Sequence, residues 1–162
     1  MAAISYWFLS PSTLLALLGK LRGWDLTKPT PTVDWKATTL DVVIPAKNEE
    51  SSIALCLASL FEQDFRIRKV TVIDDGSTDR TSQVVRRYAE LSGKKVDLIV
   101  HSQSQGKTTG IREQCESSNA DALLVLDADT VLTDRTHASH LIENLFKNAG
   151  VLRVRRGVAA NP

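Results

Sequence analysis

The chain of 162 residues has little of three features that mark large protein classes: cysteine, an excess of charge of one sign, and long apolar runs. Lysine and arginine total 20 while aspartate and glutamate total 19, which leaves a net charge of +1. Nucleic-acid-binding domains usually carry a clear basic excess, so this balance argues against a nucleic-acid partner. With 43% hydrophobic residues, the chain is long enough for one domain with a proper core and too short for two large ones.

Cysteine is too scarce for a disulfide framework. The two cysteines, Cys56 and Cys115, both fall in helix-like patterns, lack CxxC spacing and have no histidine near them. We therefore expect two buried, reduced thiols. Reduced thiols fit a reducing compartment, which predicts a cytoplasmic location, either in solution or at the cytoplasmic face of a membrane.

The N-terminal part, residues 1–38, begins with apolar pieces and continues as a linker. The apolar pieces, 4–9 and 14–18, are shorter than the roughly 20 residues that a membrane-spanning helix needs, and no basic segment precedes them as in a signal peptide. Aromatic and basic residues within 1–24 suit a membrane interface, so one hypothesis is contact with a membrane surface through this segment. The alternative is a helix that packs on the domain or on other parts of a longer protein.

From residue 39 on, short apolar runs alternate with segments of helical periodicity. The runs are continuously apolar, which is typical of parallel strands buried on both faces. We expect strands at 40–45, 69–73, 96–100 and 122–126, and helices at 50–63, 79–91, 107–118 and 136–147. The predicted fold is therefore α/β: a Rossmann-like, mostly parallel sheet with helices on both faces, in a domain over residues 39–162.

Polar segments follow each of the four predicted strands. Ligands of open parallel sheets bind outside the carboxyl ends of the strands, so these segments should converge on one rim. A rim that is merely solvated would also be polar, but it need not gather several acids around one lysine. The four segments cover residues 45–50, 74–79, 101–107 and 127–129.

Two carboxylates follow the last predicted strand, where residues 123–130 read Leu-Leu-Val-Leu-Asp-Ala-Asp-Thr. Residues two apart in a strand point to the same face, so Asp127 and Asp129 can bind one divalent cation and, through it, a phosphate. Hard oxygen ligands favour Mg²⁺ or Mn²⁺, and Mg²⁺ typically takes one or two carboxylates together with substrate phosphates. The alternative is a strand that ends in a polar turn, because aspartate is common in turns.

The other polar segments supply groups that suit a nucleotide. Asp74 or Asp75, on a glycine-containing turn, can accept a hydrogen bond from a base N–H or a ribose hydroxyl. The alternative for this turn is a helix start that Ser77 or a neighbouring threonine caps. Gly106 lets the backbone approach a ligand, and Lys107 can neutralise a diphosphate oxygen as a point charge.

A P-loop NTPase is the rival interpretation. Residues 104–109, Ser-Gln-Gly-Lys-Thr-Thr, match the end of the phosphate-binding loop, and 123–127 match its distal strand with a terminal aspartate. The pattern also requires glycine at position 101, where this chain has His101, a residue that cannot easily replace glycine at a positive φ. The NTPase pattern also leaves residues 48–49 and 74–75 unexplained, so we favour it less.

In order and spacing, the four segments resemble family 2 glycosyltransferases with the GT-A fold, over residues 40–147. The resemblance implies a nucleotide-diphosphate sugar as donor, usually a UDP-sugar, a Mn²⁺ or Mg²⁺ ion, and an inverting transfer. It also implies a nucleotide-sugar site with these members: Pro45, Ala46 and Glu49 at the nucleoside, Asp75 with Asp74 at the base or ribose, Lys107 at the diphosphate, and the motif Asp127, Ala128 and Asp129, whose two aspartates bind the metal.

The chain departs from that family after the aspartate pair. A full catalytic domain continues with an acceptor-binding half and an acidic general base, and we recognise neither before Pro162. We therefore predict the donor-binding half of a glycosyltransferase, truncated, with its catalytic base, sugar and acceptor unidentified. General-base catalysis typically contributes about 10²–10⁴-fold, so the alternative is a non-catalytic module that binds a nucleotide sugar.

Overall fold

The computed structural model describes residues 34–147, and the predicted membrane contact through residues 1–24 lies outside them. None of the helices in the described part is long and apolar enough to cross a membrane. The described part begins with a short 3-10 helix, η1 (Trp35–Ala37), which contacts the last helix, α5 (His137–Lys147). Backbone that the sequence assigns to the linker thus already touches the domain.

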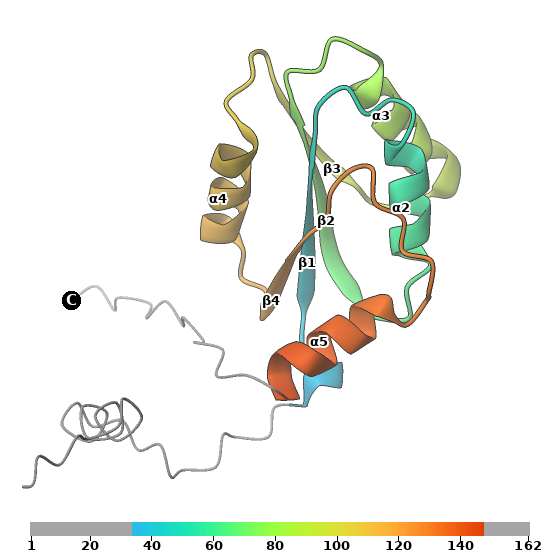
Figure 1. The fold of residues 1–162 in the computed structure, drawn as a ribbon, viewed down its shortest axis with the longest axis vertical. Helices are drawn as coiled ribbons and strands as arrows, with labels where there is room; N and C mark the ends of the chain where they lie inside the picture. Colours follow the sequence, from blue (N-terminus) through green and yellow to red (C-terminus); the bar gives the residue numbers. More distant parts are fainter. Residues whose placement is uncertain (1–33, 148–162) are drawn as a thin grey trace, which may run out of the picture. The chain divides into compact units, whose positions relative to one another are not determined.

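Four parallel strands form one sheet in the order β3-β2-β1-β4 (Figure 1). The strands are β1 (Leu40–Ala46), β2 (Ile67–Asp75), β3 (Asp97–His101) and β4 (Ala122–Val125). The helices between them are α2 (Ile53–Phe61), α3 (Thr81–Ser92) and α4 (Lys107–Ser117). Within the described residues, the predicted alternation of strands and helices is confirmed, with ends that differ by a few residues.

The direction of each crossover decides which face a helix covers. Connections between parallel strands are right-handed, so α2 and α3, which lead from β1 outward to β3, share one face. The connection from β3 back to β4 runs the other way, and α4 therefore lies on the opposite face (Figure 1). The predicted parallel sheet with helices on both faces is confirmed.

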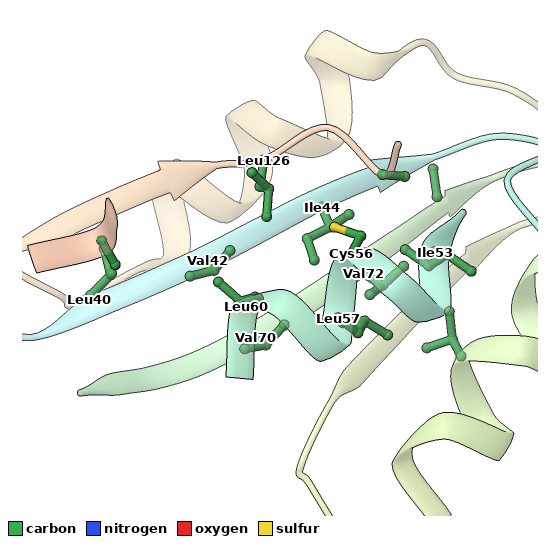
Figure 2. Packing of buried hydrophobic residues seen from close by; sticks show 14 of the residues in the cluster. Leu40, Val42, Ile44, Ile53, Cys56, Leu57, Leu60, Val70, Val72 and Leu126 are labelled. Carbon is green, nitrogen blue, oxygen red and sulfur yellow. The ribbon is translucent and has the colours of Figure 1, made fainter. Parts of the chain in front are cut away.

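The core lies between the sheet and α2 (Figure 2). Alternate residues of β1 and β2, such as Val42 and Val72, are fully buried on the face of the sheet that α2 covers. On the other face α4 approaches closely through Gly110, where an added Cβ would lie 3.0 Å from Ile73 side-chain carbons. The β1 register relative to β2 and β4 follows from these two packed faces.

One of the two thiols that the sequence predicts to be buried is exposed. Cys115 is exposed, because α4 contacts the sheet through Gly110, and five residues at about 100° each turn Cys115 to roughly 140° from that contact. Cys56 on α2 is buried as predicted.

A buried carboxylate supports the start of β1. Asp41 is 3% exposed and accepts hydrogen bonds from Nε and Nη2 of Arg68, at 2.8 and 2.5 Å, and from the Ser118 hydroxyl at 2.6 Å. Two parallel bonds from one guanidinium fix the geometry of the pair. Asp41 thereby ties β1 to β2 and to the segment that follows α4.

We expect Asp41→Ala to lower the free energy of unfolding by about 1–3 kcal/mol, because it leaves the donors of Arg68 and Ser118 without their acceptor. Urea denaturation at neutral pH measures the change. Lys69→Ala is the matched control: its ion pair with Asp97 spans 3.5 Å between half-exposed side chains, so its removal should change stability little. Equal losses in both variants would contradict this account of Asp41.

Candidate functional site

A pocket of about 370 Å³ opens at the carboxyl ends of the strands. It lies where the strand order reverses between β1 and β4, the position at which open α/β sheets bind ligands. The lining residues are Pro45, Ala46, Lys47, Glu49, Asp75, Ser104, Gly106, Lys107, Asp127, Ala128 and Asp129. The pocket therefore draws on all four predicted polar segments, and of the predicted nucleotide-sugar residues only Asp74 is not in its lining.

Asp127 and Asp129 lie in a turn that follows β4. The N–H of Leu126 still donates to the Val43 carbonyl at 3.0 Å, so the chain stays aligned with β1 up to the pocket. Ala128, between the two acids, is 3% exposed, whereas both acids are exposed. Both carboxylates therefore reach the pocket from a turn that has a buried alanine between them. They do not reach it from one face of a strand, as the sequence suggests.

An ion pair crosses the pocket. The ammonium of Lys107 lies 2.5 Å from Oδ1 of Asp127. Lys107 is the first residue of α4, and Gly106 before it has a φ of 87°, a left-handed value that glycine adopts without steric cost. Both side chains of the ion pair are 56% exposed, so the pair is solvated and weak.

Asp75, at the end of β2, is the best-supported carboxylate of the pocket. Its oxygens accept hydrogen bonds from the N–H groups of Gln105 and Gly106, at 2.7 and 2.9 Å, and from the Ser104 hydroxyl at 2.6 Å. Nδ1 of His101 lies 3.0 Å away. These contacts, that of His101 first, hold the pKa of Asp75 well below its usual range. Asp75 therefore remains ionised and fixes the loop between β3 and α4.

Sequence reasoning missed His101 and Ser104 as partners of Asp75. The sheet register places Asp75 opposite His101, at the ends of β2 and β3. In a parallel ladder, residues in register lie side by side, so the relative register of these two strands was the signal that could have found His101. No pattern in the sequence indicates that the loop after His101 folds back onto Asp75.

Asp74 serves the turn after β2. Its carboxylate accepts hydrogen bonds from the Ser77 N–H at 2.9 Å and from the Ser82 hydroxyl on α3. Gly76 in this turn has a φ of 72°, and a Cβ there would lie 2.8 Å from the Ser104 backbone nitrogen. Asp74 and Gly76 thus shape this turn, which contacts the loop between β3 and α4 that Asp75 holds.

Asn48 joins the first polar segment to the second. It has a φ of 56°, donates its N–H to the Ser77 hydroxyl at 2.9 Å and accepts the Thr78 N–H on its side-chain oxygen at 2.8 Å. The residue before α3 is Arg80, and it makes no capping hydrogen bond with its side chain. Ser77 and Thr78 therefore link two loops, and the alternative in which they cap α3 is wrong.

A buried thiol lies beneath the aspartate pair. Sγ of Cys56 is 3.6 Å from the carbonyl oxygen of Asp127, to which it can donate a hydrogen bond. Burial, followed by the charges of Asp129, Asp127 and Glu49, raises the pKa of this thiol to about 11. Cys56 thus stays protonated at neutral pH and remains a donor to the turn.

The carboxylates of the pocket fit a cation that also takes phosphate oxygens as ligands. Among the described residues, no group of three or more His, Cys, Asp or Glu side chains could hold a metal ion. Asp127 and Asp129 offer two exposed carboxylates, which suits Mg²⁺ or Mn²⁺ because such ions keep several waters and use phosphate oxygens as further ligands. A closed zinc site would need four protein ligands.

We expect Asp75→Asn to loosen the loop between β3 and α4, because an amide offers one acceptor oxygen and sets an NH₂ group against N–H donors. The amides of Gln105 and Gly106 should then exchange with solvent several-fold faster, as measured by NMR hydrogen exchange. Ser82→Ala removes a hydroxyl partner of the neighbouring Asp74 and is the matched control. Unchanged protection of both amides in Asp75→Asn would contradict the anchoring role.

The pH dependence of this contribution has a definite sign. Because the folded pKa of Asp75 lies below its ordinary value of 3.8, its stabilisation is fully present above that value and is lost as the pH falls toward the folded pKa. The difference in free energy of unfolding between the wild type and Asp75→Asn should therefore shrink as the pH falls below about 4. Urea denaturation across the acidic range tests it, and a difference that stays constant or grows below about pH 4 would refute it.

Solved structures of glycosyltransferases share this fold. The chain superposes with a TM-score of 0.63 on the mannosyltransferase PcManGT from Pyrobaculum calidifontis in complex with GDP-Man and Mn²⁺, at 25% identity over 81% of this chain and 39% of that one. For glucosyl-3-phosphoglycerate synthase from Mycobacterium tuberculosis, in complex with Mn²⁺, UDP and phosphoglyceric acid, the TM-score is 0.56 at 20% identity, over 75% and 45% of the two chains. The shared fold is therefore that of GT-A glycosyltransferases.

Sequence relatives agree with the fold. An N-acetylglucosaminyltransferase of Azorhizobium caulinodans is 37% identical over 97 residues, which are 57% of this chain and 24% of the relative. An undecaprenyl-phosphate 4-deoxy-4-formamido-L-arabinose transferase of Pseudomonas aeruginosa is 33% identical over 94 residues, 56% of this chain and 27% of the relative. The chain thus spans about a quarter of the length of these relatives. The sequence model of glycosyl transferase family 2 matches residues 41–159, and the chain therefore belongs to glycosyl transferase family 2.

Proposed function

We propose that this chain is the donor-binding half of a glycosyltransferase and that its pocket holds a nucleotide-diphosphate sugar, preferentially a UDP-sugar, with Mn²⁺ or Mg²⁺. The observation that carries the proposal is the convergence of two exposed carboxylates and a lysine in one pocket at the switch point of the sheet. Structural neighbours in complex with GDP-Man or with UDP support a nucleotide-sugar ligand.

The diphosphate end of the site is formed by the aspartate pair and α4. Asp127 and Asp129 would hold the cation, which supplies Lewis-acid stabilisation of the departing nucleotide diphosphate when it is bound. Lys107 adds a positive charge at the same edge of the pocket, where a diphosphate oxygen can replace the Asp127 carboxylate as its partner. The buried Ala128 and the Cys56 thiol keep the turn in place for this contact.

The nucleoside end is formed by the carboxyl ends of β1 and β2. Pro45 and Ala46 supply apolar surface, and Glu49 and Asp75 supply acceptors for base or ribose donors. A carboxylate has about four acceptor positions, and Asp75 already uses them within the chain. A base N–H gains access most easily by replacing the Ser104 hydroxyl, because that hydroxyl can rotate away while the backbone donors cannot.

We further propose an inverting transfer, in which a single in-line displacement at the anomeric carbon releases the nucleotide diphosphate. We assign no general base among the described residues, since the pocket carboxylates Glu49, Asp75, Asp127 and Asp129 all have roles in donor binding.

The reduced Cys56 and Cys115 suit a cytoplasmic setting. A non-catalytic module that binds the same donor is the second candidate, and the donor-binding residues of the pocket serve it equally well.

We expect UDP to bind about tenfold more tightly with Mn²⁺ present, a difference of about 1.4 kcal/mol. The double variant Asp127→Ala, Asp129→Ala should keep UDP binding but lose its dependence on the metal. Isothermal titration calorimetry with and without Mn²⁺ measures both affinities, and Asp134→Ala, an exposed acid outside the pocket, is the matched control. Metal-independent binding by the wild type, or a preference for ATP over UDP, would sink the proposal.

The enzyme and the binding module differ in turnover. If no general base is present, the chain alone should bind UDP and Mn²⁺ yet transfer sugar at a rate at least about 10²-fold below that of a complete enzyme. Release of UDP from UDP-sugars, with and without candidate acceptors, provides the measurement. Sustained transfer by the chain alone would overturn the assignment of all pocket carboxylates to donor binding.

A further inference from the structure

The cation site and its cationic neighbour are in direct contact. Asp127, one of the two carboxylates available to a divalent ion, is already paired with the Lys107 ammonium at 2.5 Å. The backbone of Lys107 cannot drift away from this position, because the adjacent Gly106 N–H is held by Asp75 at 2.9 Å. Only the flexible stem of the lysine side chain is left to move.

The pair is built to exchange partners. Both side chains are 56% exposed, and an ion pair in contact with solvent is weak enough to open when a stronger partner arrives. A divalent ion and the ammonium repel each other when both lie against the same carboxylate, so each weakens the binding of the other to Asp127. A phosphate-bearing ligand removes this conflict, since it offers the ammonium a new anionic partner in the same pocket.

We propose that Lys107 competes with the divalent cation for Asp127 and that the nucleotide diphosphate relieves this competition, so that cation and nucleotide bind with positive coupling. This inference rests on the proposed function, because it requires both ligands to share the pocket. The scarcity of protein ligands strengthens it. In the described part of the chain no group of three or more His, Cys, Asp or Glu side chains could hold a metal ion, and one of the two aspartates offered to the cation is already paired.

The coupling has a thermodynamic consequence. If UDP raises the affinity for Mn²⁺ by some factor, Mn²⁺ must raise the affinity for UDP by the same factor. Removal of the Lys107 charge should strengthen binding of Mn²⁺ alone and reduce that shared factor. A purely long-range effect of charge would instead follow from the loss of any lysine near the site.

Lys47 separates these two effects. It lines the same pocket and carries the same charge, it is exposed, and the structure gives it no ion pair with a described residue. Lys47→Met therefore removes a charge from the pocket without freeing Asp127. Lys107→Met removes the same charge and also frees Asp127.

The test uses the full chain and follows free Mn²⁺ by electron paramagnetic resonance, with and without saturating UDP. We expect Lys107→Met to bind Mn²⁺ alone about two- to fivefold more tightly than Lys47→Met, the range expected for an exposed ion pair. The UDP-dependent gain in Mn²⁺ affinity should fall in Lys107→Met and stay near the wild-type value in Lys47→Met. In an Asp127→Asn background, Lys107→Met should have no larger effect than Lys47→Met.

The outcomes distinguish the inference from the proposed function. If Mn²⁺ and UDP bind with positive coupling, but Lys107→Met and Lys47→Met behave alike, competition at Asp127 is refuted and the nucleotide-sugar site stands. If the wild type binds neither ligand, both the site and the inference fail. Equal urea midpoints for the wild type and all of the variants verify that each variant is folded.

Discussion

The parallel pairing of β1 with both β2 and β4 is the constraint on which the pocket depends. β1 is central and buried, and the chain leaves it toward β2 on one side and returns beside it as β4 on the other. The right-handed connections then place helices on opposite faces, so none of the helices within residues 34–147 covers the space between the loops that follow β1 and β4. The pocket residues 45–49 and 127–129 meet there because of that topology.

The loops around this opening hold one another before any ligand arrives. Asp75 fixes the loop before α4, Asn48 links the loop after β1 to the turn after β2, and the Cys56 thiol supports the turn of the aspartate pair. These contacts lie between segments distant in sequence, and each ties a loop around the pocket to another part of the domain. A site fixed in this way loses little conformational freedom on binding, which favours affinity for an extended, charged ligand.

The sequence predicts the sheet and most of the pocket because both follow local rules. Continuous runs such as Val42–Ile44 in β1 indicate buried parallel strands, and the polar residues after each strand must then meet at one rim. Prediction from the sequence fails where a single tertiary contact determines which residue is exposed or which group it bonds. The approach of α4 through Gly110 exposes Cys115, and three of the four partners of Asp75 come from a loop whose path no pattern specifies. Asp74 and Asp75 are alike in sequence, and only their hydrogen bonds assign one to the turn and the other to the pocket.

The central claim is that one pocket at the β1–β4 boundary binds a cation and a nucleotide diphosphate together. Paramagnetic broadening of backbone amide signals by substoichiometric Mn²⁺ in the presence of UDP tests this most directly, because the effect falls steeply with distance from the ion. The account predicts that the strongest broadening falls on residues 127–129 and on Lys107, while the amides of α5, which lines no part of the pocket, stay sharp. Strong broadening centred on α5, or none that depends on UDP, would contradict it.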